Sequence, residues 1–256
     1  MRAKGLDRRS YYIQNALWRE AFSPQADDRI GVPKPLGVLP ELAMWLQCRV
    51  EGVPAMQRLT DPNGAELAER IAGAIHKLQR AGPPAPRRHG MADELRILHR
   101  QLTPVAEANP SWAKRIQRVL AASERLGASL PDSVFRPSHR DCYADNVMVN
   151  GNWVYLVDLD LYCMADPALD IGNFIGHVTE FALRSSGRSD ALAHLEQALE
   201  AGYVDRTSEA MRAAVRVYAT LTLVRHIAIS QRIPERRAWT SGLLQLCEHR
   251  LGIRAA

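Results

Sequence analysis

Three polar side chains near the middle of the chain have the types and the spacing needed to transfer a group to a hydroxyl. Asp141 directly follows His139 and Arg140. Asn146 comes five residues after Asp141, and Asp158 follows the next apolar run. An aspartate can accept or orient the proton of an attacking hydroxyl, while an amide and a second carboxylate supply the oxygen ligands that suit Mg²⁺. The pattern predicts phosphoryl transfer, in which Asp141 orients the acceptor and Asn146 and Asp158 hold the ion that screens the phosphates.

A β-hairpin would position these side chains. Residues 147–149 and 154–157 are short runs of β-prone residues, and an Asn-Gly-Asn turn signal lies between them. Antiparallel pairing of the two runs would bring Asn146 and Asp158 side by side, within reach of one metal ion. A surface hairpin with ordinary polar flanks is the alternative interpretation, which the agreement between motif and context disfavours.

These segments resemble those of the aminoglycoside phosphotransferase and choline kinase group, small-molecule kinases with a protein-kinase-like fold. The segment that follows the hairpin is similar to the family's GDPxxDxA signature, with Ala165 in place of its usual glycine. Two earlier segments look like the end of the small lobe and the hinge. The matching segments are 32–37, 47–52, 139–146, 156–160 and 165–174. The resemblance covers most of the chain and is most specific in the catalytic segments.

The resemblance implies an α+β, protein-kinase-like two-lobed fold with a shortened N-terminal lobe. Residues 1–52 would form a partial N-terminal, nucleotide-side lobe and the hinge. Residues 53–256 would form a mostly α-helical C-terminal lobe that carries the catalytic β-hairpin and the metal site. The chain would then be truncated at its N-terminus, because relatives are typically longer there.

The resemblance also implies ATP and Mg²⁺ as the nucleotide substrate and the metal. Kinases contact the phosphates with a strand lysine that a helix glutamate holds in place. Lys4 and Glu20 resemble this pair, and Gln47 lies in the segment that looks like the hinge. These three residues are expected to bind the nucleotide.

The remaining residues of the motif are expected to support the catalytic loop. His139 would pack under the loop and hydrogen-bond to the backbone, with a general-base role as the alternative. Arg140 would balance local charge, and Asp170, near a helix start, would organise the loop. Asp160 would either join the metal ligands or cap a local turn.

Composition limits the partners and the compartment. The 256 residues carry a formal net charge of +5, but the arginines are spread over the expected helices without a long basic run. A solvated surface explains this charge, so no nucleic-acid partner is expected. No apolar run could span a membrane or serve as a signal peptide, and the four cysteines lack metal-ligand spacing. We expect a cytoplasmic protein with reduced thiols, a small-molecule hydroxyl acceptor and no membrane partner; the oligomeric state stays open.

Apolar periodicity predicts a mostly helical chain after a short mixed start. Residues 42–50 are expected to form a buried strand, and residues 81–90 a loop. Ser111 is expected to be the N-cap of its helix. The expected helices span 11–22, 64–80, 91–107, 111–128, 169–184, 189–202, 207–230 and 234–250.

Three functions compete at this stage. The first is an ATP-dependent kinase for a small hydroxylated molecule, with Asp160, Asp166 and Glu180 as candidate contacts to a cationic acceptor. The arginines of residues 207–250 argue against a highly cationic aminoglycoside. The second is a catalytically impaired nucleotide- or ligand-binding remnant of such a kinase, because the chain has no G-x-G-x-x-G loop to cover the phosphates. The third, a glycosyltransferase with a D-x-D metal motif at 158–160, ignores the spacing from Asp141 to Asn146.

Overall fold

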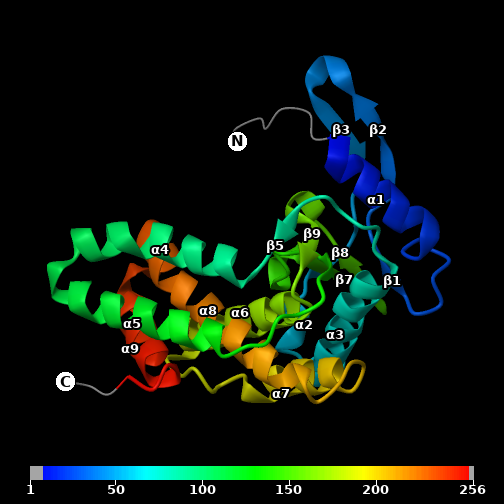
Figure 1. Cartoon of the computed structure of the whole chain (residues 1–256). Helices are drawn as coiled ribbons and strands as arrows, with labels where there is room; N and C mark the ends of the chain where they lie inside the picture. Colours follow the sequence, from blue (N-terminus) through cyan, green and yellow to red (C-terminus); the bar gives the residue numbers. More distant parts are fainter. Residues whose placement is uncertain (1–7, 254–256) are drawn as a thin grey trace.

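The computed structural model describes residues 8–253, and most of them are helical (Figure 1). The longer helices are α1 (Arg8–Glu20), α3 (Gly64–Ala81), α4 (Met91–Ala108), α5 (Pro110–Ala128), α6 (Ala168–Ser186), α7 (Ala193–Val204), α8 (Met211–Arg232) and α9 (Thr240–Arg250). The short helical turns are η1 (Pro40–Leu42), α2 (Met56–Leu59), η2 (Ala144–Asn146), η3 (Leu159–Leu161) and η4 (Pro234–Trp239). The strands are β1 (Ile30–Gly31), β2 (Pro35–Leu39), β3 (Met44–Gln47), β4 (Val53–Pro54), β5 (Arg88–His89), β6 (Arg136–Ser138), β7 (Val147–Asn150), β8 (Trp153–Leu156) and β9 (Cys163–Ala165).

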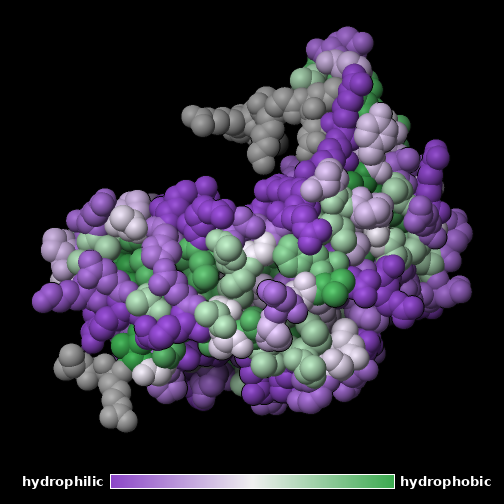
Figure 2. Space-filling model, in the orientation of Figure 1, coloured by the Kyte–Doolittle hydropathy of each residue, from purple (hydrophilic) through white to green (hydrophobic). Residues whose placement is uncertain are grey.

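Helix α1 and the antiparallel β2–β3 hairpin form a small lobe that projects above the helical body (Figure 1). The buried amide of Gln14 joins the two, because it donates to the Pro33 carbonyl at 2.8 Å and to the Gln47 side-chain oxygen at 2.6 Å. Apolar side chains remain on the surface of this lobe (Figure 2), and Leu42 is 62% exposed. A strand is present within residues 42–50, as expected, but the expectation that it is buried is wrong. In the described part of the chain β3 pairs only with β2, and none of its side chains is fully buried.

The predicted β-hairpin is present as β7 and β8. The two strands pair antiparallel from Val147 opposite Leu156 to Asn150 opposite Trp153, and the left-handed Gly151 makes the turn. Strands β1 and β4 flank the hairpin in the order β1-β8-β7-β4. Alternate side chains of β7 and β8 are buried, as expected for strands with one face on a core.

Helix α6 lies at the centre of the helical lobe and packs closely against α8. A Cβ atom added to Gly172 would lie 2.5 Å from the Cβ of Tyr218, and one added to Gly176 would lie 2.6 Å from that of Thr222. The two glycines therefore allow the helix backbones to approach where larger residues would not fit.

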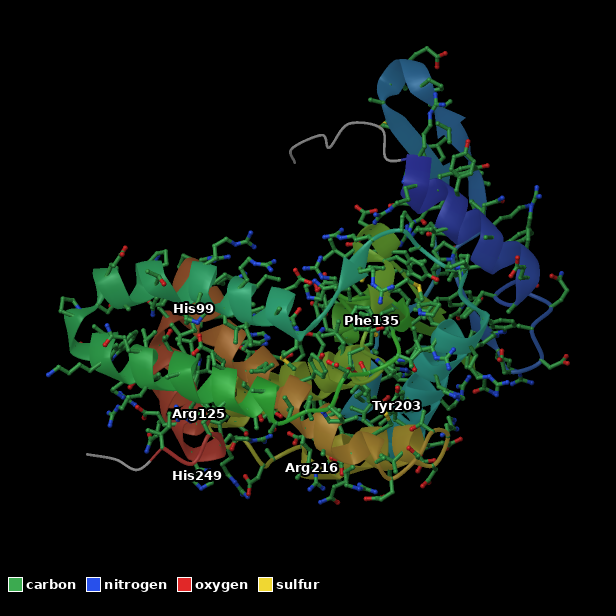
Figure 3. The ribbon with its side chains drawn as sticks, viewed as in Figure 1. His99, Arg125, Phe135, Tyr203, Arg216 and His249 are labelled. Atoms are coloured by element: carbon green, nitrogen blue, oxygen red, sulfur yellow. The ribbon has the colours of Figure 1, made fainter. Side chains whose placement is uncertain are left out.

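Helix α7 packs on α3 and is fixed there by a buried tyrosine. The Tyr203 hydroxyl, labelled in Figure 3, lies 2.8 Å from the side-chain oxygen of Gln79 and 2.7 Å from the Pro167 carbonyl. These contacts join α7 and α3 to the residue that precedes α6. On the opposite side of the lobe, α4, α5, α8 and α9 enclose a second apolar cluster.

The expected helices are present, but several boundaries differ: α7 begins at Ala193 and not at residue 189, and α8 at Met211 and not at residue 207. Ser111 is not the N-cap, because α5 already begins at Pro110 after Asn109, and proline suits the first helical position. The expected helix at 234–250 is divided into η4, which begins at Pro234, and α9. The expected loop at 81–90 contains β5, which pairs with β9. Within residues 8–253 no helix is long and apolar enough to cross a membrane.

Candidate functional site

The segment between β6 and β7 closes on itself through Asn146. The side-chain amide of Asn146 donates to the Asp141 carbonyl at 2.9 Å and approaches a carboxylate oxygen of Asp141 at 3.3 Å. The backbone N–H of Asn146 donates to the Tyr143 carbonyl at 2.9 Å. Asn146 is buried and Asp141 is half-buried. Since the amide nitrogen of Asn146 is engaged by Asp141, its oxygen remains as the ligand atom.

Asp158 lies beside this loop because the hairpin returns the chain to it. The Val157 N–H donates to the Asn146 carbonyl at 3.0 Å, so the next residue, Asp158, emerges next to Asn146. Asp158 is exposed and has a left-handed backbone, with φ of 60° and ψ of 62°. The structure thus brings together Asp141, Asn146 and Asp158, as the spacing predicted.

A buried carboxylate holds the start of the loop. Asp170, on the first turn of α6, accepts the backbone N–H groups of His139 and Arg140, each at 2.7 Å. Complete burial raises the pKa of the Asp170 carboxyl, and these two donors oppose that shift. Arg140 has a left-handed backbone with φ of 69°, which the second donor fixes. Asp170 therefore determines where Asp141, the next residue, lies.

His139 and Arg140 support the loop from below. The buried His139 ring donates from Nε2 to the Val157 carbonyl at 2.8 Å, which ties the loop to the end of β8. Burial lowers the pKa of Arg140, as does the nearby guanidinium of Arg87, while Glu94 raises it. The supporting roles of these two residues stay predictions.

A pocket of about 610 Å³ opens beside the catalytic loop, and we call it the α6–α8 pocket. Its walls are residues 54–60 around α2, the catalytic loop at Asp141, Tyr143 and Asp145, one face each of α6 and α8, and η4. This volume suits a small molecule. Asp141 lines the pocket, so the predicted catalytic carboxylate faces a space that an acceptor can enter.

The far wall of the pocket contains histidines that the sequence analysis did not select. The His177 ring stacks on Tyr143 with centroids 4.6 Å apart and meets the edge of His226 at 4.4 Å. Burial, followed by the charge of Arg225, lowers the pKa of His226 to about 3, and burial also lowers that of His177. Both rings are therefore neutral at physiological pH.

A sequence signal for this wall does exist. Polar residues recur at helical spacing along the largely buried helix α6, at Asn173, His177, Glu180 and Arg184. A row of polar side chains on a buried helix indicates that the row faces a cavity or that neighbouring groups supply its hydrogen-bond partners.

Of the three predicted nucleotide-side residues, the two that the structure describes lie away from the catalytic loop. Lys4 lies outside the described residues. Glu20 is exposed at the C-terminal end of α1. The other end of α1 approaches the site, where the Arg9 guanidinium donates to the Tyr162 carbonyl at 3.1 Å. Glu20 lies about 16 Å farther along the helix axis, because each residue adds 1.5 Å. Gln47 lies at the end of β3, with its side chain bonded to Gln14.

Of the candidate acceptor contacts, only Glu180 lines the α6–α8 pocket. Asp166 does not line the pocket, so its predicted contact with the acceptor is corrected. Its carboxylate accepts hydrogen bonds from the Ser133 hydroxyl at 2.6 Å and from the Ala168 N–H at 2.8 Å, at the start of α6. Asp160 lies half-buried in η3, where its carbonyl is 3.4 Å from a nitrogen of Arg9, and it does not line the pocket.

The donor set suits a metal that takes few ligands from the protein. Within the described residues no cluster of three or more His, Cys, Asp or Glu side chains could hold a metal ion. Asn146 and Asp158 offer one amide oxygen and one carboxylate, and Mg²⁺ is commonly held in this way with water and substrate phosphates. All four cysteines lie in the described part as free thiols, and of these only Cys48 is not buried.

Comparisons with known proteins agree with this geometry. The family model described as "Phosphotransferase enzyme family" matches residues 15–218, which is more than half of the chain. No curated protein matches the sequence.

Solved structures share the fold at low sequence identity. A choline/ethanolamine kinase family protein from Mesorhizobium loti aligns with a TM-score of 0.62 and 17% identity, covering 86% of this chain and 74% of that one. A spectinomycin phosphotransferase, solved with ADP and spectinomycin, aligns with a TM-score of 0.63 and 13% identity over 96% of this chain and 83% of that one. A choline kinase from Streptococcus pneumoniae gives 0.61 and 13%, over 97% and 82%. The predicted α+β, kinase-like fold is confirmed.

Proposed function

Since the chain belongs to the phosphotransferase enzyme family, we propose that it transfers the γ-phosphoryl group of ATP to a hydroxyl of a small molecule bound in the α6–α8 pocket. The observation that carries this proposal is the position of Asp141. Its carboxylate lines the pocket on one side and contacts Asn146 on the other. The acceptor and the metal-binding residues thus meet at a single carboxylate.

In the proposed reaction, Asp141 accepts a hydrogen bond from the acceptor hydroxyl and aligns its oxygen with the γ-phosphorus. The new oxygen–phosphorus bond forms as the bond to the β,γ-bridging oxygen breaks, ADP leaves, and the hydroxyl proton passes to Asp141. Positioning and electrostatics supply most of the rate gain in such transfers. The hydrogen bond from Asn146 to the Asp141 carbonyl restrains the loop for this task.

Asn146 and Asp158 are proposed to hold Mg²⁺, with Asp160 as a further candidate. When bound, the ion supplies charge that screens the phosphates from the approaching hydroxyl. Asp158 suits this role because it is exposed beside Asn146 and has no competing structural bond on the described residues.

The nucleotide is proposed to lie between the small lobe and the catalytic hairpin. A related fold was solved with ADP and spectinomycin, and another with ADP and hygromycin B, which supports a nucleotide and a small hydroxylated acceptor here. Gln47 remains the proposed hinge contact, and Lys4 the proposed phosphate contact. Action in the cytoplasm, without nucleic-acid or membrane partners, remains a prediction.

Replacement of the central carboxylate tests the function. Asp141→Ala is expected to reduce ADP formation with an accepted substrate by at least 10³-fold, because the hydroxyl loses its orienting partner. Nucleotide binding should be kept, since Asp141 is not among the proposed nucleotide ligands. Asp190→Ala, an exposed aspartate far along the chain, is the control. Full turnover in Asp141→Ala would refute the assignment.

The alternative is a ligand-binding remnant that no longer transfers phosphate. It is favoured by the absence of a G-x-G-x-x-G segment in the sequence and by the exposed apolar side chains of the β2–β3 hairpin. The two functions differ in turnover: the kinase forms ADP in the presence of an acceptor, whereas the remnant binds ligand without forming ADP.

A further inference from the structure

The two ends of the α6–α8 pocket carry opposite charge. At the catalytic loop the pocket is lined by the carboxylates of Asp141 and Asp145. The opposite wall presents three guanidinium groups, from Arg184 on α6, Arg225 on α8 and Arg236 on η4. The acceptor therefore spans a field that runs from acidic at the reacting end to basic at the far end.

The basic wall is not fully neutralised by its neighbours. Glu180 lies 3.1 Å from Arg184 and 3.8 Å from Arg236, so one buried carboxylate serves two guanidinium groups. Arg225 lies 3.4 Å from Glu94, which also bonds to His89 at 2.5 Å. Among the described residues, three guanidinium groups thus face two carboxylates.

The excess positive charge of the three arginines lowers the pKa of the neighbouring histidine. The pKa of His226 is lowered first by burial and then by Arg225, Arg236 and Arg184. On the other side of the pocket, Asp141, Asp145 and Asp158 add to burial in raising the pKa of Tyr143, and Arg236 opposes this shift. Acidic groups thus dominate around Tyr143 and basic groups around His226, while Arg236 lies close enough to act on both rings.

His226 supplies an independent sign of a missing ligand. It is 1% exposed and lines the pocket, yet neither of its ring nitrogens has a hydrogen-bond partner among the described residues. Buried polar atoms without partners are rare because their desolvation is uncompensated. A polar group on a bound molecule would satisfy them.

The basic wall is connected to the catalytic loop. Arg225 donates to the side-chain oxygen of Asn173, and the Asn173 amide donates to the Cys142 carbonyl at 2.7 Å. Cys142 directly follows Asp141. Asn173 therefore links Arg225 to the residue that adjoins the proposed catalytic carboxylate.

We propose that the acceptor is a hydroxylated small molecule with an anionic group, a carboxylate or a phosphate, bound by Arg225 and Arg236. Its reacting hydroxyl points to Asp141, and a neutral polar group bonds to His226. This inference rests on the proposed phosphotransferase function. A polycationic acceptor would place its amines against the guanidinium groups, which selects against it.

Acceptors of matched carbon skeleton that differ in charge test the proposal. Glucuronate, glucose and glucosamine, all pyranoses, form one set, and glycerate, glycerol and 3-amino-1,2-propanediol another; glucose 6-phosphate distinguishes phosphate from carboxylate recognition. ADP formation with Mg-ATP and the ligand-induced rise in melting temperature are measured for each. The acid is expected to exceed the neutral and amine members of its set at least tenfold in kcat/KM and to give the largest melting shift.

Single variants locate the effect. Arg236→Met should raise KM for the acid at least tenfold and abolish its advantage over the neutral member, with a smaller change in kcat. Arg225→Met should act in the same direction. If it does not fold, Arg225→Lys is measured instead and, because it keeps the charge, should retain the preference for the acid. Arg237→Met removes the same charge from the next residue of η4, which is exposed and does not line the pocket, and it should leave the preference intact.

His226→Phe keeps a flat ring without nitrogens. It should raise the melting temperature of the free protein and reduce the melting shift that the acid produces. The melting shifts report binding without turnover. The proposed phosphotransferase function and the proposed anionic acceptor can therefore be refuted independently of each other. ADP formation with neutral or cationic acceptors alone would overturn the anionic acceptor and leave the phosphotransferase standing. Binding of acids without ADP formation from any acceptor would overturn the phosphotransferase instead. Equal binding of all three charge types would refute the inference outright.

Discussion

Asp170 shows how a buried residue fixes the position of a reactive one. Its two carboxylate oxygens each accept one N–H group, from His139 and Arg140, and so set the backbone just before Asp141. The resemblance to known kinases identified Asp170 as an organiser of the loop, and the hydrogen bonds agree with that interpretation. Spacing alone could not have shown this, because the partners are separated by about thirty positions in the chain.

Asp170→Asn tests the organiser role. An asparagine offers one oxygen, so one of the two buried N–H groups would lose its acceptor. We expect the free energy of unfolding to fall by about 1–3 kcal/mol and turnover to fall with it. Urea denaturation measures the first effect and ADP formation the second. The exposed Asp190→Asn should change neither, and an unchanged Asp170→Asn would contradict the assignment.

His226 gives the protein a defined sensitivity to acid. Its pKa is about 3 in the folded state, against an ordinary value of 6.5. Below pH 6.5 His226 binds a proton in the unfolded chain but stays neutral in the folded protein. The free energy of unfolding therefore falls as the pH falls from 6.5 toward 3. The charged and titratable groups around the ring are His177 and Arg184 on α6, Arg225 on α8 and Arg236 on η4.

His226→Phe should remove this contribution. Between pH 7 and pH 4.5 the wild type is expected to lose about 2–3 kcal/mol more unfolding free energy than the variant. His177 is present in both proteins, so its own shift cancels to first order. Urea denaturation at the two pH values measures the difference. Equal losses would show that His226 is protonated in the folded state.

At the scale of elements, the close contact of α6 with α8 positions the pocket wall. Both helices contribute lining residues, so any widening between them would move His177 on one helix away from His226 on the other. Gly176 permits this approach, because a Cβ there would lie 2.6 Å from that of Thr222 and 2.9 Å from the Ala219 carbonyl.

Gly176→Ala and Gly73→Ala form a matched pair. Gly176→Ala should lower the free energy of unfolding by about 1–3 kcal/mol through overpacking. Gly73 lies within α3, where a new Cβ would meet only the movable end of Arg206 at 3.3 Å. Gly73→Ala should therefore be neutral or stabilise by up to about 1 kcal/mol, since alanine favours helix. Equal effects in urea denaturation would contradict the packing argument.

The sequence predicted the helices and strands better than it predicted which of them are buried and how they pack. Periodicity identified the helices and the β7–β8 hairpin, because apolar spacing and turn residues are local properties. The exposure of β3 and the division between η4 and α9 escaped prediction. The first depends on what covers a strand, and the second on how a proline at position 234 starts the last helical region. The pocket wall escaped as well, because His177 and His226 meet only after α6 and α8 have packed.

At the scale of the whole molecule, the chain is a large helical lobe with a small projecting lobe. The family model and the solved structures confirm the fold, while the predicted boundary after residue 52 remains a prediction. The proposed contacts at Gln47 and Asp158 come from different lobes, so we expect nucleotide binding to require both.

Mg-ATP should stabilise the intact chain. At about a hundred times its Kd a ligand adds roughly 2.7 kcal/mol, which corresponds to a melting shift of several degrees for a chain of this size. Asp158→Ala should reduce the shift, because a proposed metal ligand is lost. Glu41→Ala, on the exposed η1 turn, serves as the control. No shift at millimolar Mg-ATP would refute nucleotide binding and, with it, the kinase.

The distribution of thiols in the molecule has a practical consequence. Cys142, Cys163 and Cys247 are buried, whereas Cys48 is half-exposed immediately after β3, where its N–H donates to the Lys34 carbonyl at 2.8 Å. A maleimide fluorophore should therefore attach at this one position without mutagenesis. The dye would sit where the small lobe joins the body, so its emission would respond to any change in the angle between the two. The native protein thus carries a labelling site that would report whether ligands change the relative position of its lobes.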